Sequence, residues 1–262
     1  MKKPAKAKAL STSGKAATAS RRPVVAARPR VSAAERETLI LAEAVRFFAE
    51  VGFSGDTREL ARRAHVTHPL LYKYFATKEA LIERVYQAVY LGRWNQEWEA
   101  LIADRRLSVR DRMGQFYAAF ALVILDREWV RLFMFFGLRG ADMNQRWFAV
   151  MREKLVLPFC AEIRHEQGLP SIHEAPPTIE ETELIQGIST RIFSFGIRQH
   201  IYGMPLPGDG KVASLIRAEL DVFFDGIGPT LQVLVPPAPR TRTPARQDTS
   251  GQPTRKTRAR RA

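Results

Sequence analysis

The segment from Asp56 to Lys78, DTRELARRAHVTHPLLYKYFATK, constrains the fold more than any other part of the chain. Asp56 can accept a hydrogen bond from the free amides that open a helix, and Glu59 can reach back to that cap in a capping box. A sharp turn follows at His65, a residue type that tolerates the left-handed backbone conformation. Thr67 can then cap a second helix. The segment therefore predicts two short helices joined by a tight turn, which is a helix-turn-helix.

The two short helices each separate apolar residues from polar ones. On the first helix, the small or apolar positions are Leu60, Ala61 and Ala64, and the basic positions are Arg58, Arg62 and Arg63. On the second helix, the spacing predicts a buried side formed by Val66, Leu71 and Phe75. The side chains expected to face outward are His68, Leu70, Lys73 and Tyr74.

The run VTHPLLYKYFATKEAL resembles the signature of the TetR family, the tetracycline-repressor-like transcriptional regulators. The upstream run ILAEAVRFFAEVGF is similar to the first helix of that family, so the resemblance extends from Thr38 to Tyr86. Three features depart from the family pattern: His65 replaces the usual turn glycine, Leu70 is a bulky apolar residue on the reading face, and the loop from Gly52 to Asp56 is one residue shorter than usual. The resemblance implies a DNA-binding domain whose second motif helix enters the major groove.

The resemblance also implies roles for individual residues of the motif. Three match positions that contact phosphates: Tyr72, Tyr74 and Lys78. Two match capping positions beside the DNA backbone: Thr57 and Thr67. Four match positions near base edges: Arg58, His68, Leu70 and Lys73. Hydroxyls and cations position such a protein on DNA, and only side chains on the groove face can select sequence. Plainer roles stay open, since Tyr72 could pack beneath its helix, Lys73 could be a solvated surface lysine, and Arg62 and Arg63 could balance nearby acids.

The remaining patterns are also helical, and we predict an all-α protein without internal repeats. A helix from Ser32, with Glu35 completing a capping box, is expected to cover the motif from behind. A long helix from Thr77 to Trp98 is expected to link the domains. Further helices are expected over residues 108–125, 129–136, 144–165 with a kink near Pro158, 178–202 and 211–227.

These helices predict two domains between two basic ends. We expect a basic arm over residues 1–31, a helix-turn-helix domain over 32–78, a ligand-binding and dimerisation domain over 79–228, and a basic tail over 229–262. The ends outside residues 32–235 carry a formal charge of +16 and the whole chain +14, so residues 32–235 carry −2. These ends leave an alternative open, a nucleoid-type protein that coats DNA mainly through its basic tails.

The resemblance implies that the second domain encloses an effector and forms a homodimer. A largely apolar effector would lie among aromatic residues, for which the candidates are Trp98, Phe116, Phe120, Phe133, Trp147 and Phe193. Polar anchors for it could come from Gln115, Arg139 or His165. The last two helices match the dimerising pair, with candidate contacts at Leu184, Ile188, Phe195, Phe223 and Phe224. A plainer alternative is that any of these residues fills the core.

Other classes of protein find little support in the chain. Cys160 is the sole cysteine, which excludes a disulfide framework and favours a reducing compartment. We find no glycine-rich phosphate loop, nucleophile elbow or metal-spaced histidine pair, and so expect no enzyme activity, metal or cofactor. The longest apolar run, Phe116 to Leu125, is too short to cross a bilayer. The N-terminal composition overlaps that of transit peptides, but the resemblance implies a bacterial cytosol.

Overall fold

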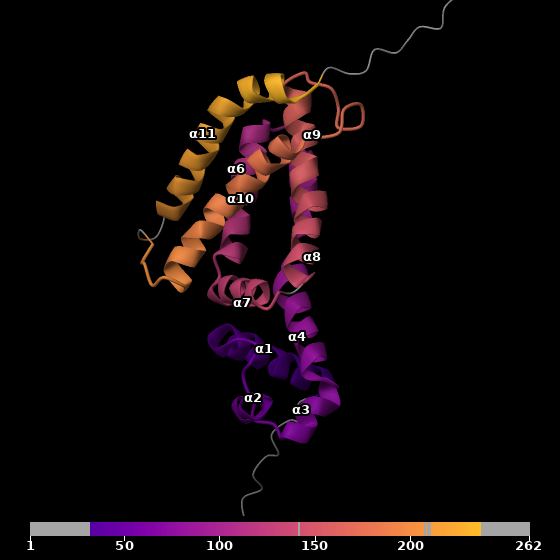
Figure 1. Cartoon of the computed structure of the whole chain (residues 1–262), viewed down its shortest axis with the longest axis vertical. Coiled ribbons are helices and arrows are strands. Elements are labelled where there is room, and N and C mark those ends of the chain that lie inside the picture. The colour runs from indigo at the N-terminus through magenta and orange to yellow at the C-terminus, as the bar shows by residue number, and fades with distance from the viewer. Residues whose placement is uncertain (1–31, 141, 207, 209–210, 237–262) are drawn as a thin grey trace, which may run out of the picture.

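The computed structural model describes residues 32–140, 142–206, 208 and 211–236. Every regular element in these ranges is a helix, which confirms the predicted all-α fold (Figure 1). The expected basic arm, residues 1–31, and the part of the expected tail after Pro236 lie outside the described residues. Within the described ranges, no helix combines the length and apolar character needed to cross a membrane.

The N-terminal domain consists of three helices, α1 (Ala33–Val51), α2 (Thr57–Arg63) and α3 (His68–Tyr74). Ser32 and Glu35 form the predicted capping box at the start of α1. The Glu35 N–H donates to Ser32 Oγ at 3.1 Å, and the Ser32 N–H donates to Glu35 Oε2 at 2.8 Å. Two free amides of the first turn are thereby satisfied.

At the start of α2, only one of the two predicted capping interactions forms. Asp56 Oδ1 accepts a hydrogen bond from the Arg58 N–H at 2.9 Å, as expected. The capping box with Glu59 was wrong, because the Glu59 carboxylate pairs instead with Arg62 at 2.7 Å and Arg63 at 3.0 Å. Hydrogen bonds from these two guanidinium groups lower the pKa of Glu59 to about 2. The carboxylate therefore stays ionised, and it offsets part of the charge of the arginines beside it.

The turn between α2 and α3 has the predicted geometry. His65 has a φ of 54°, so a non-glycine residue occupies the left-handed region. Thr67 caps α3 by accepting from the Leu70 N–H at 3.3 Å. Leu71 and Phe75 are 1% and 3% exposed, which confirms the predicted inward side of α3.

The predicted helix from Thr77 to Trp98 was wrong, because the chain forms three pieces there. α4 (Lys78–Tyr86) leads into a π-helical turn, η1 (Gln87–Leu91), and after a break α5 (Glu97–Ala103) carries Trp98. The Gly92 N–H donates to the Gln87 carbonyl at 2.7 Å and closes the wide turn. Beyond the break, Asn95 Oδ1 accepts from the Glu97 N–H at 2.9 Å, so a side chain takes the place of a helical backbone partner.

The second domain is built from the remaining helices. They are α6 (Val109–Ile124), α7 (Arg127–Leu138), α8 (Asp142–Met151), the π-helical turn η2 (Arg152–Val156), α9 (Leu157–Glu166), α10 (Ile179–His200) and α11 (Lys211–Leu234). α7 lies across the top of the N-terminal domain, while α8 and α9 continue upward in the direction of α4 (Figure 1). α10 and α11 run side by side along the outside of the second domain.

Two predicted features of these helices differ in detail from the structure. The interruption near Pro158 is the π-helical turn η2, in which the Leu157 N–H donates to the Arg152 carbonyl. Because Pro158 has no N–H, it cannot donate to a preceding carbonyl in a regular helix. The last helix does not end at Ile227, so the predicted start of the tail at Pro229 was wrong. α11 continues through Pro229 to Leu234, held by the buried side chains of Ile227 and Leu231.

A buried ion pair joins α9 to α10. Arg164 Nη2 lies 2.5 Å from Glu181 Oε2, and both side chains are fully buried. Arg164 Nη1 also donates to the Ala175 carbonyl at 2.5 Å, in the loop between the helices. Because each charge is matched and hydrogen-bonded, the pair can exist without water, and removing one partner would leave an uncompensated buried charge.

The two domains meet where the end of α1 packs on α7. The Phe53 ring lies 4.4 Å from that of Phe136, and a Cβ at Gly52 would lie 3.1 Å from the Phe135 ring. Arg131 of α7 donates to the carbonyls of Ala49 and Glu50, which end α1, and to the His200 carbonyl, which ends α10. One guanidinium thus satisfies helix-end carbonyls of both domains.

Replacing Arg131 with Met is expected to lower the free energy of unfolding by about 1–3 kcal/mol, because helix-end carbonyls lose a charged donor. Urea unfolding followed by circular dichroism would measure this change. The matched control is Arg127→Met, at an exposed position on the same helix, which should shift stability by about 0.5 kcal/mol or less. Equal losses in the two variants would contradict the assigned role.

Replacing His65 with Gly is expected to raise the free energy of unfolding by about 1 kcal/mol, because glycine has no Cβ to clash in the left-handed region. His65→Ala, which keeps a Cβ, should give no such gain. Denaturant midpoints of both variants would test the difference, and a glycine variant less stable than the alanine one would overturn this explanation.

Candidate nucleic-acid interface

The outer side of the helix-turn-helix is organised around the hydroxyl group of Thr57. Thr57 Oγ1 lies 3.0 Å from His68 Nε2 and 3.1 Å from the Tyr72 hydroxyl. The rings of His68 and Tyr72 meet edge to face at 4.9 Å. A threonine hydroxyl has one hydrogen to donate and lone pairs to accept, so it can serve both neighbours at once. This cluster fixes α3 against α2 and holds the Tyr72 ring in one place.

Thr57 therefore has a different local role from the capping position suggested by resemblance. The cap of α2 is Asp56, and Thr57 is a buried residue of the first helical turn. Thr67, by contrast, does cap its helix and is exposed.

The residues expected near base edges divide between exposed and partly buried positions. Arg58 and Lys73 are exposed, and neither forms an ion pair with any described residue. Leu70 is partly buried and lines a surface groove of about 530 Å³ together with Arg36 and Leu39 of α1. Leu70 thus lies toward α1, while Lys73 is the exposed cation of α3.

The two remaining candidate phosphate contacts, Tyr74 and Lys78, are each held by the protein. Tyr74 is partly buried and packs against the core. Lys78 Nζ donates to the Gly55 carbonyl at 2.7 Å and so ties the start of α4 to the turn before α2. A Cβ at Gly55 would lie 2.7 Å from the Phe47 ring, which explains why the turn needs glycine. A lysine ammonium has three hydrogens, so this bond leaves donors for a further acceptor.

The basic face predicted for α2 is smaller than its sequence indicates. Arg62 pairs with Glu59, and Arg63 pairs with Glu59 at 3.0 Å and with Glu50 at 2.6 Å. Hydrogen bonds to these carboxylates raise the pKa of both arginines, so they remain charged within neutralised clusters. The plainer alternative noted for Arg62 and Arg63, that they balance acids, describes the contacts they make in this structure.

Comparison with known proteins agrees with this geometry. Residues 40–85 match the family model described as bacterial regulatory proteins of the tetR family. Residues 40–85 form a TetR-family DNA-binding domain. The match takes in most of α1, both helices of the motif and nearly all of α4. No match was found among curated proteins.

Solved structures extend the likeness to the whole fold. A TetR-like transcriptional regulator from a Rhodococcus species is 20% identical, with a TM-score of 0.54, and the alignment covers 75% of this chain and 100% of that one. A TetR family transcriptional regulator from Pseudomonas syringae pv. tomato is 17% identical, with a TM-score of 0.51, over 73% and 96% of the two chains. At such identities the likeness concerns the fold. The TetR-like fold and the TetR-family domain together support a DNA-binding transcriptional regulator.

The candidate effector residues gather in two aromatic clusters of the second domain. Trp98 of α5 lies 5.5 Å from both Phe116 and Phe120 of α6, so this cluster lies between the two helices. Phe133 stacks on Trp129 at 5.0 Å and lies 5.1 Å from Phe193.

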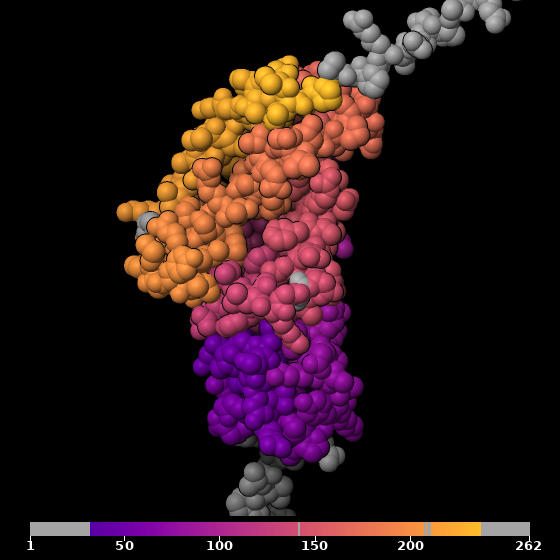
Figure 2. Space-filling model, viewed as in Figure 1, coloured from indigo at the N-terminus to yellow at the C-terminus, as the bar shows by residue number. Residues whose placement is uncertain are grey.

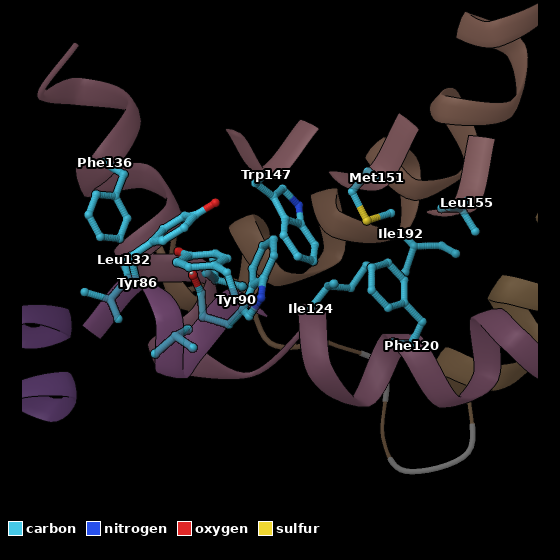
Figure 3. Packing of buried hydrophobic residues seen from close by; sticks show 14 of the residues in the cluster. Tyr86, Tyr90, Phe120, Ile124, Leu132, Phe136, Trp147, Met151, Leu155 and Ile192 are labelled. Atoms are coloured by element: carbon cyan, nitrogen blue, oxygen red, sulfur yellow. Dashed lines mark hydrogen bonds between the residues drawn. The ribbon is translucent and has the colours of Figure 1, made fainter. Parts of the chain in front are cut away.

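Trp147 of α8 belongs to the second of these clusters. Its ring lies 5.7 Å from the rings of both Tyr90 and Trp129, and Figure 3 shows it beside Tyr90. Two buried donors in this region, the Tyr86 hydroxyl and Trp129 Nε1, lack a hydrogen-bond partner among the described residues. That these two atoms lack partners could not be predicted from the sequence, because both residues follow an ordinary core pattern.

A surface groove between α10 and the segment formed by α8 and η2 is bordered by Phe148, whose ring contacts Phe133 of the second cluster, and none of the candidate polar anchors lines it. Arg139 lies near Glu79 at 3.9 Å and over the Phe53 ring, at the junction of the two domains. His165 and Gln115 lie on α9 and α6. Arg152 and Gln186, which sequence reasoning did not select, do line that groove.

The candidate dimer residues also divide into two groups. Ile188 and Phe195 are buried within the single chain, because α10 packs on the domain core. Leu184 is 38% exposed and lines a surface groove of about 310 Å³ between α10 and α11, together with Phe223 and the 68% exposed Val222. Phe224 lies under the Arg110 guanidinium at 5.3 Å.

Features of catalysis are sparse in the described part of the chain. Burial raises the pKa of the Cys160 thiol to about 12, which keeps it protonated and unreactive. Among the described residues, no three His, Cys, Asp or Glu side chains are grouped so that they could hold a metal ion. Several charged groups join helices through ion pairs, as Arg112 does with Glu162 at 2.8 Å.

Replacing Tyr72 with Phe or Lys78 with Met is expected to weaken binding to specific and random DNA by a similar factor, about 3- to 10-fold, because phosphates are the same in both. Replacing Lys73 with Met should instead lower the ratio of specific to random affinity by about tenfold, as expected for a base contact. Fluorescence anisotropy with a selected site and a scrambled duplex would measure both ratios. Equal losses on both DNAs in all three variants would count against these roles.

Proposed function

We propose that this protein is a transcriptional repressor that binds a two-fold symmetric operator as a homodimer and leaves it when a small hydrophobic effector binds. The observation that carries the proposal is the TetR-family domain, with Lys73 exposed on α3 beside the Thr57, His68 and Tyr72 cluster. A cation on the groove face and hydroxyls beside it are the groups that recognise a DNA duplex.

The proposed DNA surface contains the residues expected from the sequence, with roles adjusted to their positions. Lys73 and Arg58 reach base edges, Tyr72 and Lys78 contact phosphates, and the exposed Thr67 lies beside the backbone. His68 is held by Thr57 and presents its other ring nitrogen. Tyr74 and Leu70 contribute at the margins of α3, since each is partly covered by protein.

Dimerisation is proposed through α10 and α11. The groove between them exposes apolar side chains, Leu184 and Val222, and two glycines, Gly187 and Gly226, above which no atom lies within 4 Å. Helices pack closely where small residues leave such space. A second copy would supply the missing contacts, and the two-fold axis would set two α3 helices about 34 Å apart on one face of the DNA.

The effector is proposed to act on the aromatic clusters of the second domain. A ligand that separates α7, α8 and α10 would change how α7 holds the end of α1, because Arg131 and Phe136 form that junction. The movement would alter the spacing of the two reading helices and so weaken operator binding. The unpartnered Tyr86 hydroxyl and Trp129 Nε1 are candidate donors to a polar atom of the effector.

The proposal also assigns the protein to a bacterial cytosol and separates it from two rival functions. An enzyme would turn over a bound metabolite, whereas a regulator would release it unchanged. A nucleoid-type protein would depend on its basic ends. Deleting residues 1–31 and 236–262 should leave a regulator its site preference with a weaker salt dependence, while a coating protein would lose binding altogether.

Replacing Val222 with Glu is expected to weaken dimerisation by about 100-fold, because it would bury an unpaired charge in the interface. Sedimentation velocity over a range of concentrations would give the dissociation constant. Leu138→Glu is the matched control, since Leu138 is an exposed leucine on another helix. A dimer that tolerates Val222→Glu as well as the control would exclude this interface.

A further inference from the structure

A second groove lies on the other side of α10, between that helix and the segment formed by α8 and η2. This open groove has a volume of about 420 Å³ and is lined by Phe148, Arg152 and Val156 on one side and by Thr182, Gln186 and Thr190 on the other. Figure 2 shows the surface hollowed between the orange α10 and the pink α8. Its volume suits a molecule of one or two fused rings.

Arg152 gives this groove a positive charge that is not held in an ion pair within the described part of the chain. The other cations of the same segment are paired, Arg146 with Glu83 at 2.9 Å and Lys154 with Glu99 at 2.6 Å. Arg152 forms no ion pair with any described residue, although Glu183 also lines the groove. A guanidinium with its donors free matches the planar, two-oxygen geometry of a carboxylate or sulfonate.

Phe148 gives the groove an exposed aromatic surface close to the charge of Arg152. This side chain is 47% exposed although it belongs to an aromatic cluster. Its ring meets that of Phe133 at 5.8 Å, and Phe133 stacks on Trp129. An aromatic ring placed on Phe148 would therefore extend a stack that leads from the surface to the buried cluster.

The backbone of η2 positions Arg152 at the groove, opposite a row of polar side chains on α10. η2 begins at Arg152, and its wide turn is stabilised by the Leu157 N–H bond to the Arg152 carbonyl. Across the groove, the polar side chains of Thr182, Gln186 and Thr190 recur at intervals of four residues and so lie along one face of α10. They offer donors and acceptors to the polar rim of a ligand.

We propose that this groove binds an aromatic acid, with its anionic group on Arg152 and its ring on Phe148. The neutral part of the ligand contacts Val156, and Gln186 hydrogen-bonds its edge. The inference rests on the proposed function, because it identifies this aromatic acid as the effector of the proposed regulator. It narrows the effector from a hydrophobic molecule to one that carries a negative charge.

The test uses two fluorescent probes with the same aromatic framework. One is 1-anilinonaphthalene-8-sulfonate, which is anionic, and the other is N-phenyl-1-naphthylamine, which is neutral. Each probe is titrated into the full-length protein. Arg152→Gln should lower the affinity for the anionic probe by about tenfold and leave the affinity for the neutral probe unchanged. Phe148→Ala should lower the affinity for both probes. Arg152→Lys should restore most of the affinity for the anion.

Arg198→Gln is the matched control, since Arg198 is an exposed arginine of α10 that does not line this groove. It should bind both probes as the parent chain does. An anionic probe that binds the parent and Arg152→Gln equally would overturn the proposal. So would loss of both probes in Arg152→Gln without recovery in Arg152→Lys, because the arginine would then be holding the groove in shape.

Failure of the binding site and failure of the regulatory function are separable in the same preparation. DNA affinity is measured with and without the anionic probe. Probe binding through Arg152 that leaves DNA affinity unchanged supports the aromatic-acid site but removes its role as effector site. A chain that binds no DNA at all overturns the proposed function, while the probe titrations still decide the site.

Discussion

The contact between the end of α1 and the surface of α7 is the constraint on which the arrangement of this molecule depends. Gly52 ends α1 against the Phe135 ring, and Phe53 packs on Phe136. Arg131 supplies the polar part of the same junction by donating to carbonyls that α1 cannot satisfy itself. A small three-helix domain has little core of its own, so this junction both stabilises the domain and sets its direction. The position of α3 relative to the second domain follows from it.

How a change in the second domain could reach α3 depends on which connections are stiff. The break at Gly92 and the π-helical turn η1 mean that the chain after α4 is not one rigid rod. α4 is nonetheless held to the N-terminal domain, since Arg84 pairs with Glu37 at 3.0 Å. It is also held to the second domain, since Arg146 pairs with Glu83 at 2.9 Å. Two connections, α4 and the α1–α7 junction, therefore join the domains, and the proposed movement of α7 would reach α3 through both of them.

The sequence predicted the parts of the fold that local chemistry decides. Ser32 with Glu35, Thr67 and the left-handed His65 each depend on neighbours within a few residues, and all three adopt the expected geometry. The inward positions of Leu71 and Phe75 follow from helical spacing. The errors came where distant residues compete. Glu59 had two arginines within reach, Thr57 met side chains 11 and 15 positions away, and Pro229 was kept helical by burial of its neighbours. Pairing of this kind is a property of the folded chain.

The residues of the helix-turn-helix could be located from the sequence, but the contacts of α10 could not. One face of this helix, with Leu184 and Gly187, borders α11 and the proposed partner subunit. Another face, with Gln186 and Thr190, borders the groove that contains Arg152. Its last carbonyl, that of His200, is bound by Arg131 at 3.3 Å. A helix with three packed sides has no clear polar face in sequence, so apolar spacing alone could not separate dimer contacts from core. The same helix borders the proposed partner, the proposed ligand and the junction with the N-terminal domain. A small displacement of α10 would therefore change the contacts at all three sites.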